Sequence, residues 1–205
     1  MLSHHLDLLK TLRIRGFQSR IGKLCRLWSI AVIFLCGSAA SHAQNIDSAN
    51  EYQLKAVFIY NFSKFIEWPE SAFTDSAAGF QICVLGDDPF GEFMKALSNR
   101  NYLTHPILIK YPHNLNEAKK CHILYVSDSG KSGPWHDIVK NLGDAPVLTV
   151  SSSEEAMQAG IGIGFVIKDG KIRWAINLNS TRKAQLKVSA KLVEIAVSII
   201  GETAR

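Results

Sequence analysis

The sequence lacks the motifs that mark common classes of enzyme and cofactor-binding protein. No serine occupies a G-x-S-x-G motif, so the nucleophile elbow of an α/β-hydrolase is absent. Four histidines have neither a histidine partner at i, i+4 nor a carboxylate at metal-ligand spacing; they are His105, His113, His122 and His136. We therefore predict that the protein is not an enzyme and has no catalytic residues, no metal ion and no cofactor.

A glycine-rich phosphate loop is lacking as well. The run Ala159–Gly164 (AGIGIG) has three glycines at alternate positions. The dinucleotide-binding fingerprint requires a strand before the glycines and a helix after them. Here a helix is expected before the run and a strand after it, so the order is reversed. We predict that the run is a flexible entry into a β-hairpin.

Long apolar runs are also scarce. The run Leu27–Cys36 (LWSIAVIFLC) is about half the ~20 residues that a membrane-spanning helix needs, which argues against an uncleaved anchor. Six basic residues and one acidic residue precede it, and small residues ending in Ser41-His42-Ala43 follow it. This is the pattern of a secretory signal. We predict a signal peptide over residues 1–43, an exported domain over 44–205, and no membrane span after cleavage.

The mature chain carries no excess charge of either sign. The whole sequence has 23 basic and 18 acidic residues, a formal net charge of +5. Loss of residues 1–43 removes six basic residues and one acidic residue, which leaves 17 of each. The basic character of the full sequence is therefore no evidence for binding to nucleic acid or to an anionic membrane, and we predict no nucleic-acid partner.

Cysteine is rare, and half of it leaves with the signal. Of four cysteines, Cys25 and Cys36 precede the cleavage point, whereas Cys83 and Cys121 stay in the mature chain. Two cysteines in an exported protein usually pair, so a Cys83–Cys121 disulfide is expected. The alternative, a metal site shared with His122, lacks zinc-finger spacing.

What the sequence does contain is an alternation of strand and helix patterns, which predicts a single α/β domain. The first helix is expected from Ser48 to Trp68, with an apolar face made of Leu54, Val57, Phe58, Phe62 and Phe65. Strands are expected over 80–85, 107–111, 121–127, 147–150, 165–167 and 171–178, and helices over 89–98, 132–141, 151–159, 179–186 and 189–201. Asp169-Gly170 is a hairpin turn signal. This order favours a mixed, largely parallel sheet with helices on both faces.

Acidic residues follow the strand over 80–85. Asp87 and Asp88 come directly after Gly86, and Asp128 follows another expected strand. The carboxyl ends of such strands border the crevice in which α/β proteins usually bind ligands. The acids resemble a receiver-domain magnesium pocket, but export removes the protein from cytoplasmic phosphodonors. Asp88, before Pro89, also fits a helix cap. A ligand crevice at Asp87 and Asp88 therefore stays open.

Several stretches together resemble the YfiR family over nearly all of residues 49–200. They are EYQLKAVFIYNFSKFIEWP (Glu51–Pro69), ICVLGDDPFG (Ile82–Gly91), CHILY (Cys121–Tyr125), IRWAINL (Ile172–Leu178) and LKVS (Leu186–Ser189). The resemblance implies a small periplasmic α/β protein, dimeric and without catalytic activity. Such proteins repress an inner-membrane diguanylate cyclase by binding its periplasmic sensor domain, which controls cyclic di-GMP and biofilm formation.

The resemblance also bears on single residues. The family's bridge-forming pair maps onto Cys83 and Cys121, and the second pair that some members carry around the hairpin has no counterpart here. Gln185 stands where the family pattern suggests a glycine. This departure suggests that the local turn between the last two helices differs.

Two hypotheses on function follow. The first is a repressor that binds a membrane diguanylate cyclase and forms a homodimer, with a partner surface around the hairpin and the next helix. The candidates for that surface are Phe165, Arg173, Trp174 and Leu186, and core packing is the favoured alternative for Phe165. The second is a periplasmic small-ligand sensor that uses the crevice at Gly86–Gly91.

Overall fold

The computed structural model describes residues 48–73, 79–130 and 134–201, which fall within one compact unit over residues 45–205. The expected signal peptide, residues 1–43, lies outside the described residues. The helices are α2 (Ser48–Ser63), η2 (Glu70–Ala72), α3 (Glu92–Lys95), η3 (Ala96–Asn99), α4 (Leu115–Ala118), α5 (Trp135–Leu142), α6 (Glu154–Ala159), α7 (Leu178–Lys183) and α8 (Ala190–Glu194). The strands are β1 (Ile66–Glu67), β2 (Phe80–Leu85), β3 (Asn101–Tyr102), β4 (His105–Lys110), β5 (Ile123–Val126), β6 (Leu148–Ser151), β7 (Ile163–Lys168), β8 (Lys171–Asn177), β9 (Lys187–Val188) and β10 (Ser198–Ile200).

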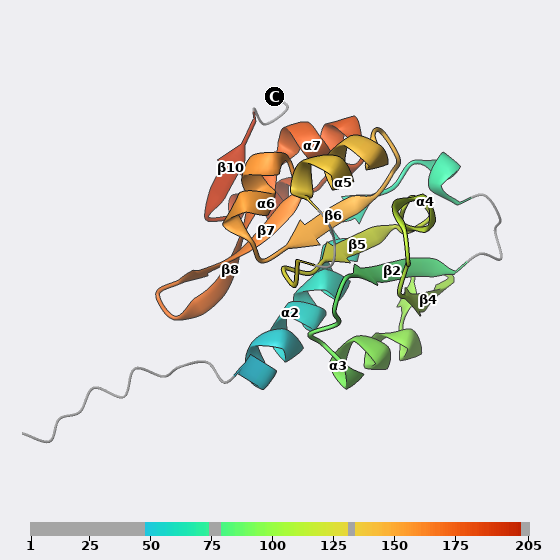
Figure 1. Cartoon of the computed structure of the whole chain (residues 1–205), viewed down its shortest axis with the longest axis horizontal. Helices are drawn as coiled ribbons and strands as arrows, with labels where there is room; N and C mark the ends of the chain where they lie inside the picture. Colours follow the sequence, from blue (N-terminus) through green and yellow to red (C-terminus); the bar gives the residue numbers. More distant parts are fainter. Residues whose placement is uncertain (1–47, 74–78, 131–133, 202–205) are drawn as a thin grey trace, which may run out of the picture. The chain divides into compact units, whose positions relative to one another are not determined.

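One large sheet organises the domain. Its eight strands run in the order β10-β8-β7-β6-β5-β2-β4-β3 (Figure 1). Five neighbouring pairs are parallel, and the β7–β8 and β3–β4 pairs are antiparallel. The short strands β1 and β9 form a separate antiparallel pair. The predicted fold class, a mixed and largely parallel sheet in a single domain, is confirmed.

Strand β2 is buried on both faces because its side chains alternate between two apolar cores. Ile82 and Val84 belong to the core that includes Ile59 and Phe62 of α2. Cys83 and Leu85 belong to the other core, together with side chains of α5 and α6. Apolar residues at successive positions therefore serve opposite faces, as expected for a central parallel strand. Helices consequently cover both faces of the sheet.

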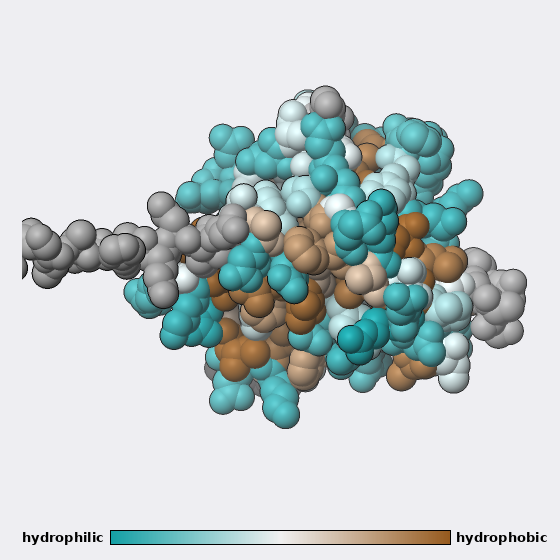
Figure 2. Space-filling model, turned by 90° about the horizontal axis from the view of Figure 1, so that it is seen from below, coloured by the Kyte–Doolittle hydropathy of each residue, from teal (hydrophilic) through white to brown (hydrophobic). Residues whose placement is uncertain are grey.

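The buried face of α2 matches the predicted one only in part: Phe62 is buried and Phe58 and Phe65 pack against the core. Leu54 and Val57 are 41% and 45% exposed, whereas the buried side includes Lys55, Ala56 and Ile59. On the face of the molecule shown in Figure 2, hydrophobic side chains gather in patches among polar ones. The residue types alone do not show which apolar stripe meets the sheet, so the sequence pattern misplaced the part of the face at Leu54 and Val57.

The C-terminal segment ends in a strand, so the prediction of one helix over 189–201 is wrong there. Helix α8 ends at Glu194, and β10 (Ser198–Ile200) pairs in parallel with β8. The backbone N–H of Val197 donates to the carbonyl of Trp174 at 3.0 Å, which begins this pairing. The β-branched residues Val197, Ile199 and Ile200 favour a strand, and the open edge of β8 offers it a partner.

Two local features of the chain were not expected from the sequence. Helix α4 lies between the strands expected over 107–111 and 121–127, where no helix was predicted, and Asn114 caps it by accepting from the N–H of Glu117 at 3.0 Å. The Glu117 carboxylate accepts from the N–H of His113, which holds the pKa of Glu117 below its usual range. Gln185 adopts φ 58°, so the turn before Leu186 takes the left-handed conformation that glycine favours.

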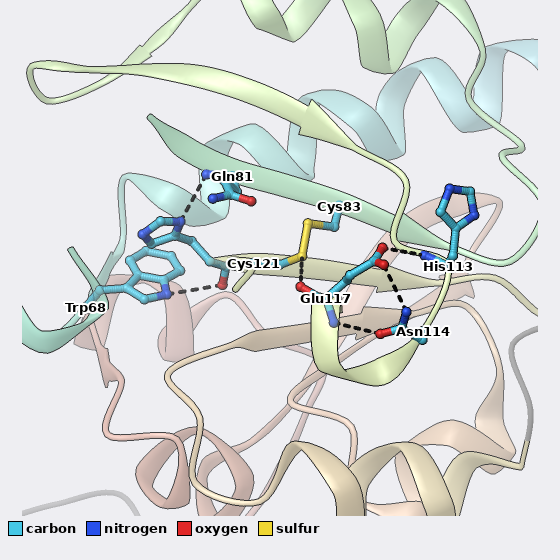
Figure 3. Close-up of a disulfide and its surroundings, with 8 residues drawn as sticks. Trp68, Gln81, Cys83, His113, Asn114, Glu117 and Cys121 are labelled. Atoms are coloured by element: carbon cyan, nitrogen blue, oxygen red, sulfur yellow. Dashed lines mark hydrogen bonds between the residues drawn. A yellow bond between two sulfur atoms is a disulfide. The ribbon is translucent and has the colours of Figure 1, made fainter. Parts of the chain in front are cut away.

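The predicted disulfide between Cys83 and Cys121 is present. It links β2 to the residues that precede β5, beside helix α4 and its Glu117 (Figure 3). The sequence separation of 38 residues corresponds to about 4 kcal/mol of stabilisation on the chain-entropy estimate. The bridge therefore fixes the two strands whose carboxyl ends border the crevice.

Replacing both cysteines, Cys83→Ser with Cys121→Ser, should lower the free energy of unfolding by about 2–4 kcal/mol because the unfolded chain loses its cross-link. Urea denaturation followed by tryptophan fluorescence measures this change. The native protein in excess dithiothreitol is the control and should lose a similar amount. An unchanged urea midpoint in the double variant would show that the bridge contributes no stability.

His122 lies next to the disulfide and is almost fully buried. Its Nδ1 accepts from the backbone N–H of Gln81 at 3.0 Å, and its own carbonyl accepts from Trp68 Nε1 at 3.1 Å. Its ring stacks on Phe80 and packs against Phe73. Burial lowers the pKa of His122 to about 4. The neutral ring is therefore the form that the folded protein favours.

Protonation of His122 should make stability fall as the medium becomes acidic. Between pH 6.5 and about 4 the unfolded chain binds this proton and the folded chain does not. The free energy of unfolding therefore falls by up to ~1.4 kcal/mol for each unit by which the pH decreases. The stability is fully present above this window and decreases through it. In His122→Phe, the free energy of unfolding measured by urea denaturation should fall less steeply between pH 7 and 4 than in the native protein. His136→Phe, at an exposed position, is the matched control and should keep the native pH dependence. The same pH dependence in both variants would contradict the assignment to His122.

Candidate functional site

A crevice opens where the connections of the sheet reverse direction. Strand β2 lies between β4 and β5, so the chain leaves it toward one side of the sheet and returns on the other. Such a switch point is the usual place for a ligand in an open α/β sheet. A cavity of about 1020 Å³ borders it, lined by the loops that follow β2, β5 and β6, by the first turns of α2, and by the hairpin of β7 and β8.

The structure brings the predicted acids together at this cavity. Asp87, Asp88 and Asp128 all line it. Asp88 is engaged within its own loop, because its carboxylate accepts from the N–H groups of Phe90 and Gly91 at 2.8 and 3.3 Å. The same carboxylate accepts from the Tyr111 hydroxyl at 3.0 Å. Asp88 therefore holds the loop, while Asp87 and Asp128 are exposed at the cavity mouth.

The Asp88 contact changes the acidity of its tyrosine partner. Burial, and then the hydrogen bond to Asp88, raises the pKa of Tyr111 to about 12. The phenol consequently stays protonated and donates at neutral pH. Helix α3 begins at Glu92, after Gly91 with φ 54°, so the expected helix start at Pro89 is displaced and Asp88 organises the turn before the helix.

Lys55 is the side chain at this site that sequence reasoning missed. It is only 3% exposed, forms an ion pair with Glu51, and its Nζ donates to Ser152 Oγ at 2.9 Å. Ser152 Oγ lies 3.2 Å from the Tyr125 hydroxyl, so either can donate to the other. The Lys55 ammonium also lies over the Tyr52 ring, 4.8 Å from its centroid. The available signal was a lysine four residues after a glutamate in the helix.

These contacts favour binding over chemistry. The Lys55 ammonium forms its ion pair with the Glu51 carboxylate, and an ammonium group has no lone pair to take a proton from Ser152. The lysine–serine contact is therefore a hydrogen bond and does not activate a nucleophile. Burial raises the pKa of Tyr125 to about 12, which keeps its hydroxyl neutral. In the described ranges, histidine, cysteine, aspartate and glutamate form no group of three that could hold a metal ion.

The residues predicted to bind a partner do not share one surface. Phe165 and Trp174 are 5% and 7% exposed and pack against Phe62, with ring centroids 5.7 and 5.5 Å away. Leu186 is 4% exposed. Arg173, by contrast, is exposed on β8. Phe165 also lines the cavity described above, so its packing supports the cavity wall.

Leu186 borders a second, smaller hollow. This groove has a volume of about 580 Å³ and is lined by Leu178, Thr181, Arg182, Leu186, Lys187, Val188, Ala190, Val193 and Glu194. Its apolar residues lie between charged ones at the rim, which is the composition of a protein-binding surface. Both hollows therefore involve residues or loops that the sequence singled out.

Comparison with known proteins places the chain in a family. Residues 52–197 match the model of the family described as YfiR/HmsC-like. The chain belongs to this family. No curated protein matches the sequence. Among solved structures, a conserved domain protein from Vibrio cholerae O1 biovar El Tor strain N16961 is similar at 8% identity and a TM-score of 0.49, over 72% of this chain and 60% of that protein.

Membership of the YfiR/HmsC-like family supports a periplasmic regulator of diguanylate cyclase signalling in general. Members of the family are regulators rather than enzymes. Over the part of the chain that the structure describes, no helix has the length and apolar character to cross a membrane.

The Glu51–Lys55 pair makes a direct prediction about stability. Glu51→Gln should lower the free energy of unfolding by about 1–3 kcal/mol because it leaves the buried Lys55 cation without its counter-charge. Lys55→Met should cost less, since it removes the charge and keeps the volume, while Ser152 and Tyr125 still bond each other. Urea denaturation at pH 7 gives both values, and a larger loss for Lys55→Met than for Glu51→Gln would contradict the pairing.

Proposed function

We propose that the protein is a periplasmic negative regulator that binds the periplasmic sensor domain of an inner-membrane diguanylate cyclase. By this binding it would limit cyclic di-GMP synthesis and biofilm formation. The observation that carries the proposal is the family match over residues 52–197. The near-neutral mature charge and the lysine–serine contact without an activated nucleophile are consistent with a binding role. Export by residues 1–43 and a homodimeric state belong to the same proposal.

The groove beside Leu186 is the surface that best fits the cyclase. Its apolar floor is continuous with the main core, against which Val188 and Val193 pack. Its rim carries Arg182 and Lys187 against the single acid Glu194, so the rim favours an acidic partner segment. Of the residues predicted to bind a partner, Leu186 contributes to the floor of this groove, while the exposed Arg173 remains a candidate elsewhere on β8.

The groove can be tested with two matched charge reversals. Lys187→Glu, on the rim, should weaken co-purification with the cyclase about fivefold or more, because like charges would then face each other. Cyclic di-GMP in cells should rise accordingly. Lys183→Glu changes a lysine of α7 that is also exposed but lies outside the groove, and it should leave both readouts unchanged.

Equal effects of the two variants would show that the groove is not the contact surface. A native protein that recovers no cyclase from solubilised inner membrane, together with unchanged cyclic di-GMP on deletion, would contradict the function itself.

The alternative function is a periplasmic ligand sensor that uses the crevice at Gly86–Gly91. The observation that favours it is the cavity of about 1020 Å³, which lies at the switch point of the sheet and contains the Lys55–Ser152–Tyr125 network. A sensor and a repressor are compatible roles, because a ligand that binds the crevice could alter the affinity for the cyclase.

A further inference from the structure

The β7–β8 hairpin extends beyond its neighbour in the sheet. Strand β7 pairs with β8 over all six residues, Ile163 to Lys168, but with β6 only at Ile163 and Gly164. Strand β6 ends at Ser151, where the chain leaves the sheet toward α6. From Phe165 onward, the side of β7 that faces away from β8 has no partner strand among the described residues. Figure 1 shows the hairpin projecting past the end of β6.

The register identifies the backbone groups on this free edge. The N–H of Asn177 donates to the carbonyl of Gly162 at 2.8 Å, which sets the alternation of an antiparallel ladder. Gly164 and Val166 accordingly direct their N–H and C=O groups toward β8. Phe165 and Ile167 direct their N–H and C=O groups to the opposite side, which a longer β6 would occupy. At least the N–H and C=O of Ile167 thus offer an unpaired donor and acceptor.

The free edge forms one wall of the cavity at the switch point. Phe165 and Ile167 line this cavity, and Ser152 and Ser153 line it from the end of β6. Neighbouring strands lie ~4.8 Å apart, so the space beside β7 is where one more strand would pair. Four residues, Phe165 to Lys168, match about 13 Å of extended chain at ~3.3 Å per residue.

The side chains around the edge define what could occupy it. Met157, Ala175 and Ile200 supply apolar wall on the side of α6 and β10. The rim is acidic: the lining includes Asp87, Asp88, Asp128 and Glu154, whereas its one basic residue, Lys55, and Glu51 neutralise each other as an ion pair. A segment with apolar and basic side chains at alternate positions therefore complements both the wall and the rim.

We propose that this cavity binds an extended, basic peptide segment of a partner protein, which adds to the sheet as a strand beside Phe165–Lys168. Main-chain hydrogen bonds to Ile167 hold the segment, and alternate side chains meet the apolar wall and the acidic rim, as in other cases of strand addition. The proposal deepens the ligand-binding role of the cavity by naming the class of ligand, and it does not depend on the groove beside Leu186.

The test uses the mature protein and a capped hexapeptide of alternating lysine and valine, with binding measured by titration calorimetry. Ile167→Pro removes the outward N–H without removing a bond to β8, and edge positions tolerate proline. It should weaken binding about tenfold or more. Ile167→Val keeps the N–H and is the matched control, with affinity within about twofold of the native protein. Thermal unfolding of both variants checks that the fold is kept.

Two further peptides isolate the contributions of backbone and charge. The same hexapeptide with N-methyl groups on alternate backbone nitrogens cannot pair with an edge and should not bind. A glutamate–valine hexapeptide should bind at least about tenfold more weakly, because it meets the acidic rim. On binding of the basic peptide, the Ile167 amide should become protected from hydrogen exchange.

Several results would overturn the proposal. They are equal binding by Ile167→Pro and the native protein, equal binding of the N-methylated peptide, and the absence of saturable binding by the basic peptide. Saturable binding of phenethylamine at the cavity, with none by the peptide, would show instead that the ligand is a small cation. Lys187→Glu should leave peptide binding unchanged, so failure at the cavity and failure at the cyclase-binding groove are distinguishable.

Discussion

The burial of β2 on both faces is the constraint on which the rest of the structure depends. Its side chains enter two separate cores, so helices must cover the sheet on both sides. Cys83 then ties this strand to the chain just before β5, and the neighbours of β2 in the sheet place the reversal of chain direction at its carboxyl end. The crevice, the acids that border it and the cap at Asp88 all follow from where β2 ends.

Much of this could be predicted from the sequence because the signals are local. Short apolar runs between turn residues marked the central strands, Asp169-Gly170 marked the hairpin, and the removal of Cys25 and Cys36 with the expected signal left one cysteine pair. The failures concern information that lies elsewhere in the chain. Leu54 and Val57 belong to an apolar stripe, but only the position of the sheet decides that Ala56 and Ile59 are the buried side. Likewise, the segment after α8 becomes a strand because β8 offers it an open edge.

The candidate site was predicted less completely than the fold. Asp87, Asp88 and Asp128 were expected to converge, and all three line one cavity. Lys55 was not expected, since its burial depends on Ser152, which is distant in sequence, and on Glu51. The network explains why a cavity with a lysine, a serine and a tyrosine in contact favours binding: the three groups are engaged with one another as hydrogen-bond partners, and an ammonium group has no lone pair with which to take a proton.

An unpaired strand edge is a hazard for a protein, because it can pair with the same edge of another molecule. Here the exposed hairpin carries Lys168, Asp169, Lys171 and Arg173, and charged residues on an edge oppose pairing between copies. The acids of the cavity rim oppose an acidic segment and attract a basic one, so a basic segment pairs where these acids outweigh the basic residues of the hairpin. The backbone groups of the edge could pair with many different segments, and the charged side chains around it discriminate between them. Discrimination between partners thus explains why the hairpin carries charged residues. The core packing of Phe165 and Trp174 does not explain them.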